Sequence, residues 1–199
     1  MTLALSRPVC SCLASLASAL LCAALHGCSS SPPAPPTGQG VVHDLRIVRH
    51  TSAALVDQRA DEIVRDMGDV LRIVDGTGDV ACDVGFLRLG PVGTFAVGDG
   101  IVNSAADFQE VLDVPGEIKV VRQINWCGTL SPNIIGCAPV PGASLAVVRF
   151  AADLEGILWV HEYGHNQGLS HRNAAGAVMN AFIDETHRRV NAAECQAYE

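Results

Sequence analysis

The most constraining feature of this sequence is a histidine cluster between positions 161 and 171, which reads HEYGHNQGLSH. His161 and His165 are one helical turn apart, so both imidazoles would project from the same face of a helix. Gly168 follows, and a glycine at that place can adopt the left-handed conformation that ends a helix. The resulting bend would bring His171 back toward the other two rings. The cluster therefore requires a helix, a sharp turn and a returning chain within one short segment.

Converging imidazoles suit a zinc ion, which His161, His165 and His171 would hold together. Three protein ligands leave the fourth position open to water, as in catalytic rather than structural zinc sites. Glu162 is rotated about 100° around the helix from His161, so it can miss the metal and still reach that water. It can then act as general base while zinc stabilises the oxyanion, an arrangement that favours hydrolysis of an amide bond.

The same residues resemble the extended zinc signature of the metzincin metalloendopeptidases. Metzincins have a methionine-containing turn beneath the metal, and here Met179 follows His171 at a short spacing that is similar to the matrixin branch. The resemblance implies one zinc ion on His161, His165 and His171, with Glu162 as general base, Gly168 at the turn and Met179 as the floor of the site.

The resemblance also implies a fold and a mode of substrate binding. The family fold is α+β, with a twisted, mostly parallel mixed sheet of about five strands, an active-site helix and a small carboxy-terminal Met-turn subdomain. A peptide substrate would bind in extended form along an edge strand. Residues 145–150, or the segment before them, are the candidate for that strand.

Apolar periodicity and turn residues predict the elements along the chain. A strand is expected at 41–50 and a helix at 56–74, which Gly68 can end early. Short apolar runs at 80–89, 94–97 and 118–124 predict strands, and 105–112 a short helix. A strand at 145–150 precedes the histidine helix, which is expected to run from an N-cap at Asp153 to Leu169, with the face that contains Gly164 packed on the sheet. A last helix is expected at 184–197.

The amino terminus has the composition of a targeting segment. One arginine near the start is followed by an apolar stretch that ends in Leu25-His26-Gly27-Cys28, which resembles the lipobox of bacterial lipoproteins. This predicts a signal peptide at 1–28 with Cys28 as the lipidated residue, a Pro/Ser/Gly-rich tether at 29–40, and a metalloprotease catalytic domain at 41–199. The chain is therefore expected to be exported and lipid-anchored in the bacterial cell envelope. An ordinary cleaved signal, and a secreted protein, is the alternative.

Four cysteines lie outside this leader: Cys82, Cys127, Cys137 and Cys195. An even number in an exported chain indicates disulfide bonds. A Cys127–Cys137 bond is favoured because the intervening GTLSPNIIG is rich in turn residues. That leaves Cys82–Cys195, which would tie the carboxy-terminal segment to the sheet. A cysteine-based zinc site is the alternative.

The charge balance limits the partners. The formal net charge is −8 and no basic block is present, which argues against nucleic acid and against electrostatic docking on anionic lipid. The expected partner is a protein or peptide substrate, with membrane contact only through the lipid anchor, and the chain is expected to be a monomer. Asp75, Asp79 and Asp83 are carboxylates that suit Ca²⁺, although a solvated turn is the favoured interpretation.

Two functions fit these features best, and a zinc hydrolase that acts on another kind of amide is a weaker third. The first is a zinc-dependent endopeptidase that uses the three-histidine zinc and Glu162. The alternative is a catalytically inactive, zinc-holding surface lipoprotein that binds a protein partner. Glu162 argues against the alternative, because a purely structural zinc site has no use for a base beside an open coordination position.

Overall fold

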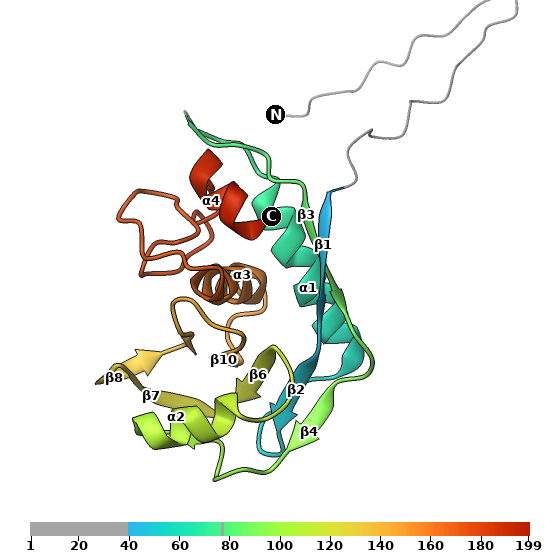
Figure 1. Cartoon of the computed structure of the whole chain (residues 1–199), viewed down its shortest axis with the longest axis vertical. Helices are drawn as coiled ribbons and strands as arrows, with labels where there is room; N and C mark the ends of the chain where they lie inside the picture. Colours follow the sequence, from blue (N-terminus) through green and yellow to red (C-terminus); the bar gives the residue numbers. More distant parts are fainter. Residues whose placement is uncertain (1–39, 77) are drawn as a thin grey trace, which may run out of the picture. The chain divides into compact units, whose positions relative to one another are not determined.

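The computed structural model describes residues 40–76 and 78–199, so the predicted signal peptide, Cys28 and nearly all of the tether lie outside the described residues. The elements follow one another along the chain as drawn in Figure 1. They are β1 (Val41–Leu45), β2 (Ile47–His50), α1 (Asp57–Leu71), β3 (Val84–Arg88), β4 (Gly93–Phe95), β5 (Ile101–Val102), α2 (Ala105–Leu112), β6 (Ile118–Val121), β7 (Gln123–Cys127), β8 (Thr129–Ile134), β9 (Gly136–Cys137), β10 (Leu145–Val148), α3 (Glu155–Asn166) and α4 (Ala192–Tyr198).

The largest sheet has five strands in the order β4-β2-β6-β10-β9. The first four are parallel to their neighbours, and β9 runs antiparallel to β10 at the edge. The central strands β6 and β10 are almost entirely buried, as expected for parallel strands covered on both faces. The α+β class and the mostly parallel mixed sheet implied by the sequence are confirmed.

Two smaller sheets extend this core. β1 pairs in parallel with β3, and β5, β7 and β8 form a separate three-stranded sheet. The single strand expected at 41–50 is therefore wrong: it divides at Arg46, and its halves enter different sheets. The cause lies in the bonds of Arg46, whose carbonyl accepts from the backbone N–H of Glu117 and whose own N–H donates to the Glu117 carboxylate.

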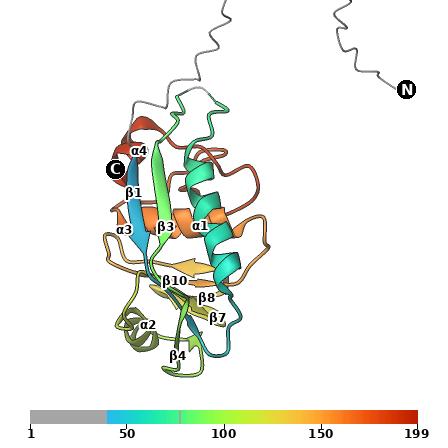
Figure 2. The ribbon, with the colours of Figure 1, turned by 90° about the vertical axis from the view of Figure 1, so that its right-hand side faces the viewer.

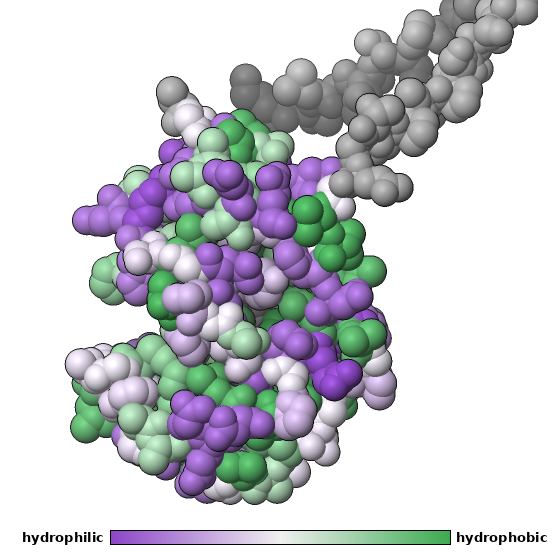
Figure 3. Space-filling view, in the orientation of Figure 1, coloured by the Kyte–Doolittle hydropathy of each residue, from purple (hydrophilic) through white to green (hydrophobic). Residues whose placement is uncertain are grey.

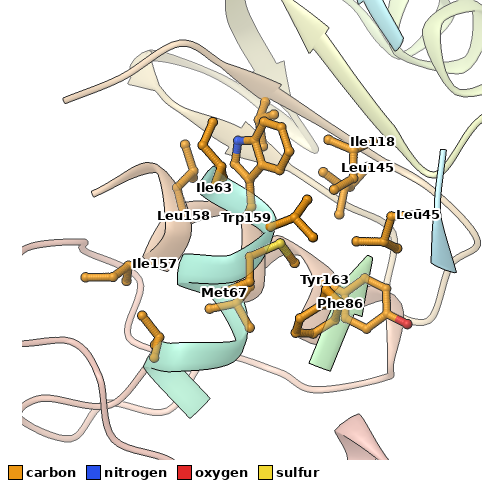
Figure 4. Packing of buried hydrophobic residues seen from close by; sticks show 14 of the residues in the cluster. Leu45, Ile63, Met67, Phe86, Ile118, Leu145, Ile157, Leu158, Trp159 and Tyr163 are labelled. Atoms are coloured by element: carbon orange, nitrogen blue, oxygen red, sulfur yellow. The ribbon is translucent and has the colours of Figure 1, made fainter. Parts of the chain in front are cut away.

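Helix α1 packs across the core because its apolar residues recur at helical spacing. It lies beside β3, and α3 crosses behind it (Figure 2). Figure 4 shows Ile63 and Met67 of α1 close to Trp159 of α3 in the buried cluster. Gly68 does not end the helix early, because it is buried inside the helix and the pattern of apolar contacts continues to Leu71.

The boundaries of α3 differ from those predicted. The helix begins at Glu155 and ends at Asn166, and its N-cap is Leu154, which makes no side-chain cap bond. Asp153 was therefore the wrong cap. The chain enters the helix from a turn closed by the Leu154 N–H and the Ala151 carbonyl, and the Glu155 carboxylate, not that of Asp153, accepts a bond from the backbone ahead of the helix.

Two further corrections concern the second half of the chain. The last helix covers only Ala192–Tyr198, because Asn191 and Glu194 form a reciprocal capping box that begins it there. The GTLSPNIIG segment is not a simple loop: β8 pairs antiparallel with β7, and β9 joins the large sheet. Disulfide bonds join Cys127 to Cys137 and Cys82 to Cys195, which is the pairing favoured from the sequence. Among the described residues no helix combines the length and the apolar character needed to cross a bilayer.

Candidate metal centre

Three imidazoles meet at one point of the structure. His161 and His165 lie on α3 and His171 follows the turn, and one ring nitrogen of each lies within 4.8 Å of the others. The Nε2 atoms of His165 and His171 are 3.1 Å apart. Gly168 has a φ of 89° and accomplishes the reversal that returns the chain, with the Leu169 N–H bonded to the Gly164 carbonyl.

Backbone carbonyls orient two of these rings. The Nδ1–H of His161 donates to the carbonyl of Val178, and the Nδ1–H of His165 donates to the carbonyl of Leu169, both at 2.7 Å. Each bond places the proton on Nδ1 and leaves the lone pair of Nε2 directed at the common point. Burial lowers the pKa of His161 to about 4 and lowers the pKa of His165 and His171, which favours the neutral form that binds metals.

The donor set fits a zinc ion. Two nitrogens that each lie 2.0–2.1 Å from a tetrahedral ion are about 3.3 Å apart, which is close to the observed separation of the His165 and His171 Nε2 atoms. A second group of metal-binding residue types, Cys82, Cys195 and Glu199, is different, because its two sulfurs are joined in a disulfide bond.

Glu162 lies beside the point where the three imidazoles meet. The side chain is 6% exposed, and it makes no hydrogen bond or ion pair with any residue in 40–76 or 78–199. Burial raises its pKa to about 8. A carboxyl group with a pKa this close to neutrality can exchange a proton with a neighbouring group near pH 7.

The carboxylate borders an open cleft of about 310 Å³. Figure 3 shows a notch on the left-hand side of the molecule, between the β7–β8 hairpin and the segment that follows α3. The cleft is lined by Cys127, Gly136, Ala138, Val140, Glu162, His165, Ser170 and His171. The point where the three imidazoles meet and the Glu162 carboxylate are therefore both accessible to a ligand from the cleft.

The edge strand beside the cleft is β9, not β10. β10 lies between β6 and β9, so residues 145–150 cannot be the free edge expected to bind an extended peptide. The segment before them, which was the other candidate, contains β9. Gly136 in this strand lies so close to α3 that a Cβ there would overlap the Glu162 carboxylate. The sequence pattern did not reveal Gly136, because β9 lies in a stretch rich in turn residues.

A second group of residues supports α3 from the side opposite the sheet. Met179 is fully buried in a turn closed by the Asn180 N–H and the Ala177 carbonyl. A Cβ on Gly164 would lie 2.5 Å from the Met179 sulfur and from the Tyr198 hydroxyl. Gly164 thus permits close approach to Met179 and to α4, whereas the sequence interpretation had this face packed on the sheet.

Asn166, the last residue of α3, anchors the wall of the cleft. Its side-chain amide donates to the carbonyls of Pro139 and Ser144, at 3.3 and 3.1 Å. The segment between these carbonyls includes Val140, which lines the cleft. The end of α3 therefore holds the cleft wall in place.

The aspartates considered for calcium have cationic neighbours. Arg189 Nε lies 2.5 Å from Asp75 Oδ1 and 3.6 Å from Asp79 Oδ2, and Arg72 Nε lies 3.6 Å from Asp83 Oδ1. These contacts are typical of an ion-paired turn in which Asp75 and Asp83 are exposed and Asp79 is buried. The solvated turn favoured from the sequence stays the prediction, with calcium as its alternative.

Comparison with known proteins finds a likeness of fold. The crystal structure of archaemetzincin from Methanopyrus kandleri matches with a TM-score of 0.50 and 14% sequence identity, over 82% of this chain and 96% of that chain. At this identity the likeness concerns the fold alone. No family model matches the sequence, and no curated protein matches it.

Proposed function

We propose that this chain is a zinc-dependent endopeptidase. The observation that carries the proposal is the convergence of three neutral imidazoles beside an unpaired, buried glutamate at the edge of an open cleft. The fold shared with archaemetzincin supports it. The resemblance of HEYGHNQGLSH to the metzincin signature supports it independently, because that resemblance was drawn from the sequence.

Each residue has a distinct role in the proposed mechanism. His161, His165 and His171 would hold the zinc ion, which when bound supplies a Lewis acid that activates water and polarises a substrate carbonyl. Glu162 would accept the proton of the attacking water and pass it to the leaving amine. Met179 would form the floor beneath the histidines, and Gly168 fixes the turn that returns His171. The spacing from His171 to Met179 favours the matrixin-like branch, which stays a prediction.

The substrate is proposed to be an extended polypeptide bound beside β9. This strand has one neighbour in the large sheet, β10, so its other edge can pair with an added strand. Gly136 places the backbone of β9 against Glu162. A substrate strand on that edge would carry its peptide bonds past the proposed base.

The test is cleavage-site profiling of the purified protein on a peptide library, with mass spectrometry to map the products. Wild type should cleave, lose activity with a zinc chelator, and regain it when zinc is restored. A Glu162→Ala variant should keep its zinc and lose cleavage. Wild type that holds zinc on three histidines but cleaves nothing would favour the zinc-holding, partner-binding lipoprotein. Unchanged cleavage by Glu162→Ala would exclude the assigned base.

The chain is also proposed to act outside the cytoplasm, anchored through a lipid on Cys28. The composition of the amino terminus supports this, as do two disulfide bonds, which persist in oxidising compartments. A Cys28→Ala variant should leave the membrane fraction and enter the soluble one. Membrane association that persists in this variant would refute lipid anchoring at this residue.

A further inference from the structure

The residue after the third histidine makes an ion pair that nothing in the sequence pattern had indicated. Arg172 Nε lies 2.6 Å from Glu194 Oε1, and its Nη2 lies 2.8 Å from Glu194 Oε2. The pair is bidentate, and the Glu194 side chain is only 7% exposed. Bidentate arginine–carboxylate pairs determine the relative orientation of the two side chains in addition to stabilising their contact.

Arg172 is also bonded to the turn that contains Met179. Its backbone N–H donates to the Met179 carbonyl at 2.7 Å, and its Nη2 donates to the Arg189 carbonyl at 3.0 Å. The same Arg189 carbonyl accepts from the Val178 N–H. The Val178 carbonyl in turn accepts from Nδ1 of His161. Arg172 is thus joined covalently to His171 and, through two hydrogen bonds, to the group that orients His161.

Glu194 is itself held by α4. Its carboxylate accepts from the Asn191 N–H, completing the capping box, and its neighbour Cys195 is bonded to Cys82. One helical turn later, the Tyr198 hydroxyl donates to the Val160 carbonyl of α3 and lies 3.5 Å from the Met179 sulfur. The carboxylate that meets Arg172 therefore belongs to a helix with a covalent tie and a second contact at the site.

We infer that Arg172 is a positioning residue for the metal centre. Its pair with Glu194 anchors Arg172 to α4, and this anchor keeps His171 and the Val178 carbonyl in the positions that direct the imidazoles at the metal. The inference rests on the proposed zinc-dependent function. Arg172 is not among the residues that line the cleft, so it acts through the histidines and not on substrate. Groups that orient metal ligands influence metal affinity and activity by about tenfold to a hundredfold when they are removed.

The test compares Arg172→Met with Arg88→Met. Arg88 of β3 also makes a bidentate pair, with Asp61 of α1. Its Nε lies 2.8 Å from Asp61 Oδ1 and its Nη2 lies 2.9 Å from Asp61 Oδ2. Zinc affinity is measured by chelator competition, and the visible spectrum is recorded after cobalt substitution. Arg172→Met should bind zinc about tenfold to a hundredfold more weakly, with an altered cobalt spectrum. It should also lower kcat while leaving KM for a peptide near its original value. Arg88→Met should match wild type in all four readouts.

A Glu194→Gln variant guards against a folding defect, since glutamine can still complete the capping box while the charge is lost. It should weaken zinc binding in the same direction, and Arg172→Lys should recover part of the affinity lost in Arg172→Met. Wild-type zinc affinity and cobalt spectra in both Arg172→Met and Glu194→Gln would overturn the inference. If the wild type itself bound no zinc, the proposed function would fail first; if only the variants were unaffected, the positioning role alone would fail.

Discussion

Helix α3 contains two buried glutamates in opposite surroundings. Glu155 in the first turn is 0% exposed and Glu162 two turns later is 6% exposed. Glu155 accepts bonds from Arg59, Arg149 and the Phe150 backbone N–H. Glu162 has no hydrogen-bonding partner among the described residues, and burial raises its pKa to about 8.

This difference distinguishes a glutamate that joins neighbouring elements from one that has no hydrogen-bonding partner among the described residues. A buried charge is tolerated when it is paired and fully hydrogen-bonded, and Glu155 meets that condition at the point where α1, the end of β10 and α3 come together. Glu162 lacks such partners, and burial instead favours its neutral, protonated form, which agrees with the general-base role that we propose for it. The predictions below change one carboxylate, or its surroundings, at a time.

The largest effect is expected for Glu162→Gln. Loss of a general base should lower kcat/KM on a peptide by about 10²–10⁴-fold. The free energy of unfolding should stay the same or rise, since no partner loses a bond. Steady-state kinetics and denaturant unfolding provide the two measurements. A fall in stability with little change in activity would reverse the roles of the two carboxylates.

Glu155→Gln should have the converse result. It removes the counter-charge that Arg59 and Arg149 share, although Arg59 keeps its pair with Glu62. Because both guanidinium groups retain some solvent contact, the free energy of unfolding should fall by about 2–4 kcal/mol. Zinc content and kcat/KM per folded molecule should match wild type. A variant of normal stability would show that the Arg59–Glu155–Arg149 cluster does not hold the end of the helix.

Gly136→Ala tests the surroundings of Glu162 without altering the carboxylate. The new Cβ would overlap the carboxylate, which must move away. A displacement of about 1 Å in a catalytic group can cost about 10²-fold in rate, so kcat should fall by about tenfold to a hundredfold. Gly85→Ala is the matched control, because a Cβ there meets only ordinary contacts at 3.6 Å and beyond. Equal activity of the two variants would contradict the close approach of β9 to Glu162.

The smallest effect is expected for Arg59→Met. It removes one of the two cations around Glu155 and leaves Arg149 in place, so the free energy of unfolding should fall by about 1–2 kcal/mol. Cleavage activity should not change. A loss as large as that of Glu155→Gln would mean that Arg149 contributes little to the cluster.

The parts of the fold that the sequence predicts well are those determined by local pattern. Helix α2 begins and ends where expected, with Ser104 accepting from the Asp107 N–H as its cap. Strands β6 and β10 lie within apolar, β-branched runs, although the single strand expected at 118–124 is wrong, because the chain divides at Arg122 into β6 and β7 of different sheets. The histidine cluster converges for the same reason, because helical spacing and one left-handed glycine suffice to bring its rings together.

The parts that were missed depend on partners outside the segment itself. β8 and β9 lie in a turn-rich stretch and exist through pairing with β7 and β10. The Arg172–Glu194 pair and the contact of Gly164 with Tyr198 join α3 and its following turn to α4. One signal was present in the sequence: Asn191 and Glu194 have the spacing of a capping box, which places the start of the last helix at 192 rather than 184.

The central claim is that three histidines hold one zinc ion. X-ray absorption at the zinc edge, together with zinc content per chain, tests it on the purified wild-type protein. We predict one zinc per chain with three imidazole nitrogens at about 2.0–2.1 Å and a light-atom ligand in the remaining position. A protein that takes up no zinc, or a zinc ion bound by sulfur or by fewer than three imidazoles, would contradict the account.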